Sequence, residues 1–242
     1  MIFSALLLCL GGGPDGPALP RSAAAAHSSD EAARWSFTLE PFLWLAGIEG
    51  EGGDGSAPPV DIGENVSLFG QIDGGFLLAL EARAPEGRFS MLADGLYLSL
   101  ADDEGSLQTD TDVWMVELGA GLPLGASAWE AIAGLRYVDL EFDTEIAGLG
   151  TDSQEDWIDP WVGARGTIPF GESWAFGCRA DVGGFGVGTQ FTWQALAGLE
   201  VDLGKSVRLD VGYRAISLDF DDGDLEYDAL IRGPLIALAF RL

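Results

Sequence analysis

Hydrophobic and polar positions alternate along most of the chain from residue 35 onward. Between Trp114 and Leu122, even positions carry Trp, Val, Leu, Ala and Leu, whereas odd positions carry Met, Glu and Gly. A period of two gives a β-strand one apolar face and one polar or small face. The same split recurs in residues 130–137, 158–165, 176–183, 193–201 and 208–214. The pattern therefore predicts an all-β protein.

The alternating segments predict a closed antiparallel transmembrane β-barrel of about ten strands, with eight or twelve as alternatives. Strands of about 12 residues, at ~3.3 Å per residue and a tilt of ~45°, span about 28 Å, which matches the hydrocarbon core of a bilayer. The expected strands are 35–48, 75–83, 88–101, 111–122, 129–142, 157–168, 174–185, 191–203, 207–218 and 229–242.

The connections between these strands alternate in length. Those after the even-numbered strands are short and contain Pro, Gly or Ser, whereas those after the odd-numbered strands are mostly long. This asymmetry is typical of short periplasmic turns and longer extracellular loops. The first outer segment, 50–74, has an apolar side, and we expect it to pack over the mouth of the barrel as a short helix.

Charge is distributed unevenly along the chain. The sequence has 39 Asp plus Glu against 12 Lys plus Arg, a net charge of −27, which argues against a nucleic-acid partner. With 48% hydrophobic residues the chain is also not disordered. The expected outer segments 48–73, 101–112, 139–156, 186–190 and 219–228 hold 24 acids and no Lys or Arg.

The N-terminus resembles a cleaved secretory signal. An apolar run over residues 2–10 precedes a small-residue site ending at Ala26. We therefore expect a signal peptide over 1–26, a short N-terminal extension over 27–34 and the transmembrane barrel over 35–242. The expected location is the bacterial outer membrane.

Several segments resemble outer-membrane β-barrel proteins of Gram-negative bacteria, of the OmpA-like or porin-like kind. The similarity lies in WSFTLEPFLWLAGIEG (35–50), LRYVDL (135–140), DPWVGAR (159–165), DVGGFG (181–186) and GPLIALAFRL (233–242). These motifs are strand patterns, so the resemblance implies fold and location rather than activity. The last strand is similar to the C-terminal signal that the assembly machinery recognises, although it ends in Leu rather than an aromatic residue. The resemblance places this signal at Ile236, Leu238, Phe240 and Leu242.

Charged residues within the strands fall on the polar phase, which would face the lumen. Buried charges must be paired or hydrated. Two interpretations stay open: a network in which the ions satisfy one another, or a narrow ion-selective pore. The expected network comprises Glu40, Glu81, Arg83, Asp94, Glu117, Glu130, Arg136, Asp159, Arg165, Arg179, Asp181, Glu200, Arg208, Asp210, Arg214 and Arg241.

The acidic outer segments allow a solvated rim or weak capture of Ca²⁺ or Mg²⁺, which favour oxygen ligands. The densest cluster is Asp219, Asp221, Asp222, Asp224 and Glu226. Its spacing is not that of an EF-hand. No other cofactor is expected.

Catalysis is not expected. His27 is the single histidine and precedes the barrel, so the histidine-dependent mechanisms of acyl transfer have no base. The leading hypothesis is therefore a structural or passive small-solute or ion passage role, with outer-membrane lipid, lipopolysaccharide and the assembly machinery as partners of a monomer. A surface binding or adhesion protein using acidic loops is the alternative. A third possibility is a soluble lipocalin-like barrel, which would require the arginines to face outward and the apolar residues to face inward.

Overall fold

The computed structural model describes residues 34–53, 60–61, 66–67, 72–104, 107–125, 127–146, 149–221 and 226–242. None of the helical structure in these ranges is long and apolar enough to cross a membrane. The strands are β1 (Ser36–Trp44), β2 (Gly47–Gly53), β3 (Val60–Asp61), β4 (Val66–Ser67), β5 (Ile72–Arg83), β6 (Ser90–Glu104), β7 (Leu107–Pro123), β8 (Trp129–Ile146), β9 (Leu149–Pro169), β10 (Trp174–Gly183), β11 (Phe191–Asp202), β12 (Val207–Asp221) and β13 (Glu226–Arg241).

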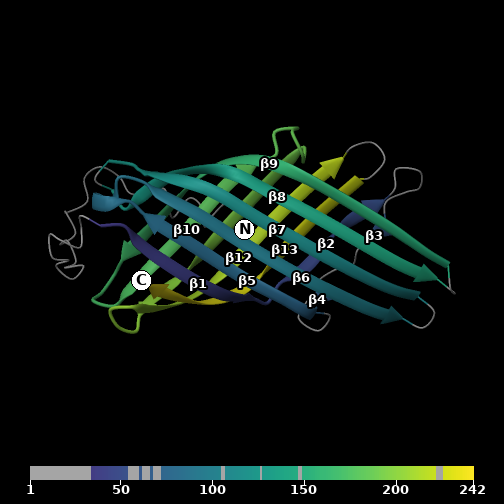
Figure 1. Cartoon of the computed structure of the whole chain (residues 1–242), viewed down its shortest axis with the longest axis horizontal. Helices are drawn as coiled ribbons and strands as arrows, with labels where there is room; N and C mark the ends of the chain where they lie inside the picture. Colours follow the sequence, from purple (N-terminus) through teal and green to yellow (C-terminus); the bar gives the residue numbers. More distant parts are fainter. Residues whose placement is uncertain are drawn as a thin grey trace.

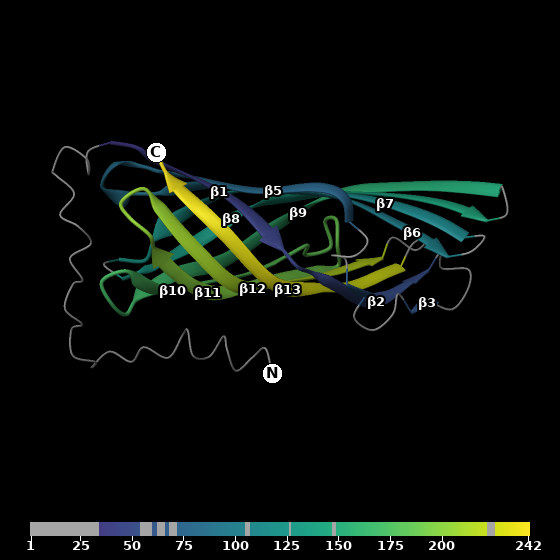
Figure 2. The same cartoon turned by 90° about the horizontal axis from the view of Figure 1, so that it is seen from below.

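The strands form one antiparallel sheet that closes on itself. Each strand from β5 to β13 pairs with its sequence neighbour, and β1 pairs with both β5 and β13. Since β1 and β2 form one wall strand interrupted at Leu45–Ala46, and β3 and β4 only flank β2, the wall has ten strands. Figures 1 and 2 show the tilted strands wrapping around a common axis. The predicted ten-strand barrel is confirmed.

The closing joint between β1 and β5 is short. It covers Ser36–Pro41 opposite Leu78–Arg83, beyond which β1 and β2 no longer pair with β5 but continue along β13. Pro41 has no backbone N–H to continue a ladder. The wall is therefore closed by a narrow overlap at the turn end of β1.

Strand pairing extends into the described parts of three expected outer segments, 101–112, 139–156 and 219–228, which corrects the predicted strand ends. Pairing of β6 with β7 continues to Glu104 opposite Leu107, and that of β8 with β9 to Ile146 opposite Leu149. Figure 2 shows these strands extending well past the rest of the wall. Acidic residues replace the apolar ones in these extensions, so the hydrophobic alternation stops before the strand does. The predicted short helix over 50–74 is also wrong for its described parts, because β3 and β4 are strands that pair with β2.

The two faces of the wall have the predicted orientation. On β7, the outward Leu118 and Leu122 are 59% and 62% exposed, whereas the inward Met115 and Glu117 are buried. Aromatic rings gather on the outside at the turn end, where Trp35 packs edge-on against Phe89 at 5.5 Å between ring centroids. An apolar outside and a charged inside are the reverse of a soluble lipocalin-like barrel.

Candidate functional site

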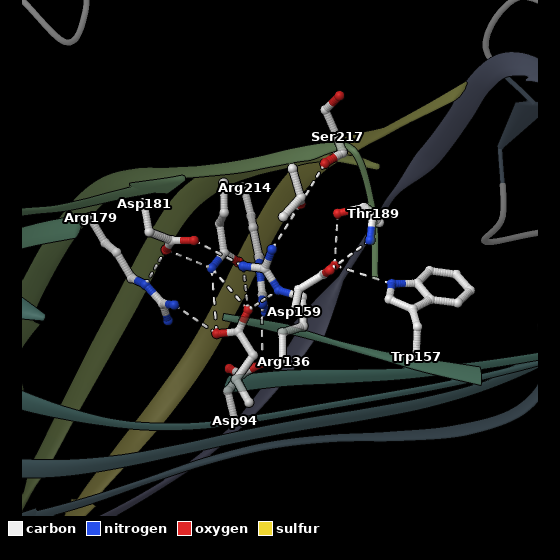
Figure 3. Close-up of polar contacts among 12 residues, drawn as sticks. Asp94, Arg136, Trp157, Asp159, Arg179, Asp181, Thr189, Arg214 and Ser217 are labelled. Atoms are coloured by element: carbon white, nitrogen blue, oxygen red, sulfur yellow. Dashed lines mark hydrogen bonds and ion pairs between the residues drawn. The ribbon is translucent and has the colours of Figure 1, made fainter. Parts of the chain in front are cut away.

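The lumen is the candidate site, and Arg136 on β8 lies at its centre. Its side chain is fully buried. Its Nε donates to Glu117 Oε1 at 2.7 Å, its Nη2 to Asp181 Oδ1 at 2.9 Å and its Nη1 to Thr192 Oγ1 at 2.9 Å. One guanidinium thus connects β8 to β7, β10 and β11 (Figure 3).

A second arginine shares the same carboxylates. Arg179 Nη2 donates to Glu117 Oε2 at 2.7 Å, and its Nε donates to Asp181 Oδ2 at 2.9 Å. Its guanidinium also lies 4.9 Å from the centroid of the Trp161 ring. Each carboxylate therefore accepts from two guanidinium groups, which compensates its loss of hydration.

Arg214 on β12 extends the central cluster to the far side of the lumen. Its Nε donates to Gln194 Oε1 at 2.7 Å and its Nη2 to Asp94 Oδ1 on β6 at 3.1 Å. Its guanidinium also lies 5.3 Å from the centroid of the Trp44 ring. Arg214 thus marks the boundary between charged and aromatic side chains.

Asp159 is bound by neutral donors. It is fully buried and accepts from Thr189 N at 2.7 Å, Thr189 Oγ1 at 2.9 Å and Trp157 Nε1 at 3.1 Å. Figure 3 shows Asp159 between Arg136 and these two donors. Asp159 therefore fixes the segment after β10 to the wall of the barrel.

Two further clusters lie nearer the turns and are more open. In one, Glu130 accepts from Arg83 at 2.6 Å and from Arg165 at 2.8 Å, and Glu81 accepts from both arginines. In the other, Arg208 contacts three carboxylates. Its partners are Asp210 at 2.8 Å, Glu200 at 3.3 Å and Glu40 at 3.4 Å.

The outer half of the lumen is apolar, which the sequence reasoning missed. Met115, Val138, Ile216 and Leu218 are each at most 2% exposed. The buried cluster comprises Phe42, Trp44, Ala46, Leu96, Met115, Val138, Leu140, Trp157, Ile216, Leu218, Leu235 and Ala237. The lumen therefore contains an apolar layer on the loop side of the central ions.

The architecture has counterparts among solved structures. The structure is similar to the outer membrane protease OmpT from Escherichia coli, with a TM-score of 0.56, 8% identity and coverage of 87% of this chain and 97% of that chain. The chain has the fold of an outer-membrane β-barrel. The translocator domain of autotransporter NalP from Neisseria meningitidis matches with a TM-score of 0.47, 12% identity and coverage of 86% and 89%. No protein-family model and no curated protein sequence matches this chain.

Most of the predicted lumen network comes together in this outer-membrane barrel. The central cluster unites Asp94, Glu117, Arg136, Arg179, Asp181 and Arg214, and the turn-side clusters hold the other predicted ions except two. Asp159 accepts from Thr189 and Trp157 as described. Arg241 instead forms an exposed pair with Asp202 at the turn end of β13.

Sequence reasoning gave no role to the neutral polar partners Thr189, Thr192, Gln194 and Ser90. Apart from Thr189, which follows β10, these residues share the inward phase of the arginines. Their inward positions in the alternating pattern could therefore have identified these three residues as partners of the buried ions.

Acidic residues of the extensions lie opposite one another across the barrel strands. Asp219 on β12 is opposite Asp228 on β13. Asp139 likewise faces Asp156 across β8 and β9. Residues directly opposite share one face of a sheet, and like charges there destabilise the pairing.

The predicted cation cluster is only partly described. Asp221 lies opposite Glu226, and Asp219 lies two residues before Asp221 on the same strand, whereas Asp222 and Asp224 fall outside the described residues. Within the described part of the chain, no group of His, Cys, Asp and Glu is arranged to hold a metal ion. The predicted signal peptide, most of the predicted N-terminal extension and His27 also lie outside the described residues.

The residues of the predicted assembly signal lie on the last strand and its end. Ile236 and Leu238 are 45% and 40% exposed, Phe240 is half-buried and Leu242 is exposed. The inward Ala237 and Ala239 between them are buried. The alternation expected of β13 is therefore present.

Proposed function

We propose that this chain is a structural outer-membrane barrel with a lumen that does not conduct. The observation that supports this proposal is the full burial of lumen side chains at two successive levels. Arg136 and Asp159 are fully buried at the first level, and Val138 and Ile216 are fully buried at the second. Close-packed interiors contain few voids larger than a water molecule, which supports a lumen without a continuous path for ions.

The proposal places the barrel in the bacterial outer membrane as a monomer, exported with a signal peptide. Its partners would be outer-membrane lipid, lipopolysaccharide and the assembly machinery, and no nucleic acid is expected. We also propose that the barrel is not an enzyme, because the sequence offers only His27 as a histidine base.

Planar-bilayer recording tests the closed lumen. The wild-type barrel should insert without discrete conductance steps. A double variant, Arg136→Ala with Val138→Ala, removes one side chain from each level and should produce steps if it folds, which heat-modifiable gel mobility reports. Regular ion-selective steps from the wild type would contradict the proposal and favour a passage role.

Surface binding through the acidic extensions is the second candidate. The observation that favours it is the pair of acids Asp219 and Asp228, which lie opposite each other, because a divalent cation bound loosely from solution would relieve their mutual repulsion without a preformed site. Calorimetry with Ca²⁺ at physiological salt should give a saturable heat that Asp228→Asn reduces and Glu86→Gln, at the turn end, does not. No saturable heat would contradict this candidate.

A further inference from the structure

The segment that joins β10 to β11, residues 184–190, differs from every other outer connection. It contains no charged residue, whereas each of the other expected outer segments contains at least five acids. It presents apolar side chains instead. Phe185 is 54% exposed and Val187 is 70% exposed. We call residues 184–190 the apolar loop.

The base of the apolar loop lies beside the point on β9 where the outward residues change from apolar to acidic. Gly184 N donates to Pro160 O at 3.1 Å on β9, where Ile158 is the last apolar outward residue and Asp156 is the next outward one. On its other side, Gln190 N donates to Asp219 O at 2.8 Å. Figure 1 shows the connection between β10 and β11 near the middle of the long axis, far from the tips of β8 and β9.

The backbone of the apolar loop adopts an uncommon conformation that displays this apolar tip. Phe185 has a φ of 54°, in the left-handed region that residues other than glycine rarely adopt. Its neighbours Gly184 and Gly186 have φ of 84° and 71°, which glycine tolerates. The turn is closed by Val187 N donating to Gly184 O at 3.0 Å.

Buried hydrogen bonds hold the base of the apolar loop. Thr189 is fully buried and donates through both N and Oγ1 to Asp159. Gly186 N donates to Thr189 O at 3.1 Å. The exposed tip is therefore attached directly to the central part of the lumen wall.

We propose that the apolar loop binds acyl chains of outer-leaflet lipids through Phe185 and Val187. Its apolar surface continues that of the flanking strands, where the outward Val182 is 40% exposed and Phe191 is 46% exposed. Apolar side chains at this depth gain the free energy of leaving water. The loop therefore extends the lipid-facing surface on one side of the barrel, whereas the acids beyond Ile158 end that surface on the neighbouring strands.

Spin-label accessibility tests this proposal in the full chain with Cys9→Ala and Cys178→Ala. A nitroxide at Val187→Cys is compared with labels at Val162→Cys, a lipid-facing position that is 50% exposed, and at Gln154→Cys on the extension of β9. In phosphatidylcholine vesicles, the ratio of collisions with oxygen to collisions with a water-soluble nickel chelate should be similar at 187 and 162. It should be several-fold higher at 187 than at 154.

A ratio at 187 equal to that at 154 would overturn the proposal and place the apolar loop in water, where it would suit a protein partner instead. A second measurement does not rely on a label. Phe185→Asn with Val187→Ser keeps a residue that tolerates positive φ at 185. This variant should fold, by heat-modifiable mobility, yet insert into vesicles more slowly than the wild type. Equal insertion rates would also contradict the proposal.

Discussion

Carboxylates occupy two regions of this barrel and have opposite surroundings in each. In the lumen, Glu117 and Asp181 each contact two guanidinium groups and are excluded from water. On the outer extensions, Asp228 lies opposite Asp219, and the expected outer segment 219–228 contains no Lys or Arg. The net charge of −27 therefore combines a nearly balanced interior with an unbalanced exterior. The contrast predicts that charge removal destabilises the first region and stabilises the second.

The largest effect is expected in the lumen from Arg136→Ala. The substitution leaves Glu117 and Asp181 buried with fewer partners, which should cost about 3–5 kcal/mol of unfolding free energy. Urea unfolding in lipid vesicles measures it. The control is Arg88→Ala, which removes an exposed pair with Glu86 and should cost about 0–1 kcal/mol. Equal losses from the two variants would remove the distinction between buried and exposed pairs.

A smaller loss is expected at the more open turn-side cluster from Glu130→Gln. The amide retains the shape of the carboxylate but loses the charge that Arg83 and Arg165 contact, which should cost about 1–3 kcal/mol. The same unfolding assay applies, with the exposed Glu172→Gln as the control. A loss as large as that of Arg136→Ala would show that partial hydration does not weaken this cluster.

On the outer extension, removing a charge should raise stability rather than lower it. Asp228→Asn removes one charge from a pair of like charges, Asp219 and Asp228, and should stabilise the end of the β12–β13 hairpin by about 0.2–1 kcal/mol. Slower amide hydrogen exchange in this hairpin reports the gain. Asp202→Asn serves as the opposite control, because Asp202 is paired with Arg241 and its loss should not stabilise the barrel.

The smallest expected effect is a difference between the two regions in how amide protection responds to salt. The Debye length falls from about 10 Å at 0.1 M to about 3 Å at 1 M, so added salt screens exposed like charges far more than buried pairs. Amide protection in the outer ends of β12 and β13 should therefore rise with NaCl, while protection around Arg136 should change little. A uniform change throughout the wall would contradict the distinction.

Much of the fold could be predicted from alternation alone. The period of two placed Leu118 outward and Glu117 inward, and the arginines of the central and turn-side clusters, though not Arg241, were correctly expected to face inward. Which ions meet was not predictable, because strands far apart in sequence, such as those of Arg214 and Asp94, face each other only after closure and tilt set the geometry. The ends of the strands were missed because backbone pairing continues after apolar side chains stop.

The apolar layer of the lumen was missed for a related reason. Where both faces of a strand are apolar, as in Met115 and its neighbours Trp114 and Val116, the alternation no longer distinguishes inside from outside. Trp44 lies between Leu43 and Leu45, so its face was open for this reason, whereas Trp157 was wrongly expected in an outward-facing aromatic girdle on the loop side. The structure places both among buried residues of the lumen.

The ion pairs that join strands far apart in the wall also have a mechanical consequence. Arg214 links β12 to Asp94 on β6, and Arg165 links β9 to Glu81 on β5. A thin cylinder under lateral pressure from the bilayer deforms most easily by flattening to an ellipse. Cross-links between opposite walls resist that deformation, so these pairs act as struts that keep the cross-section round.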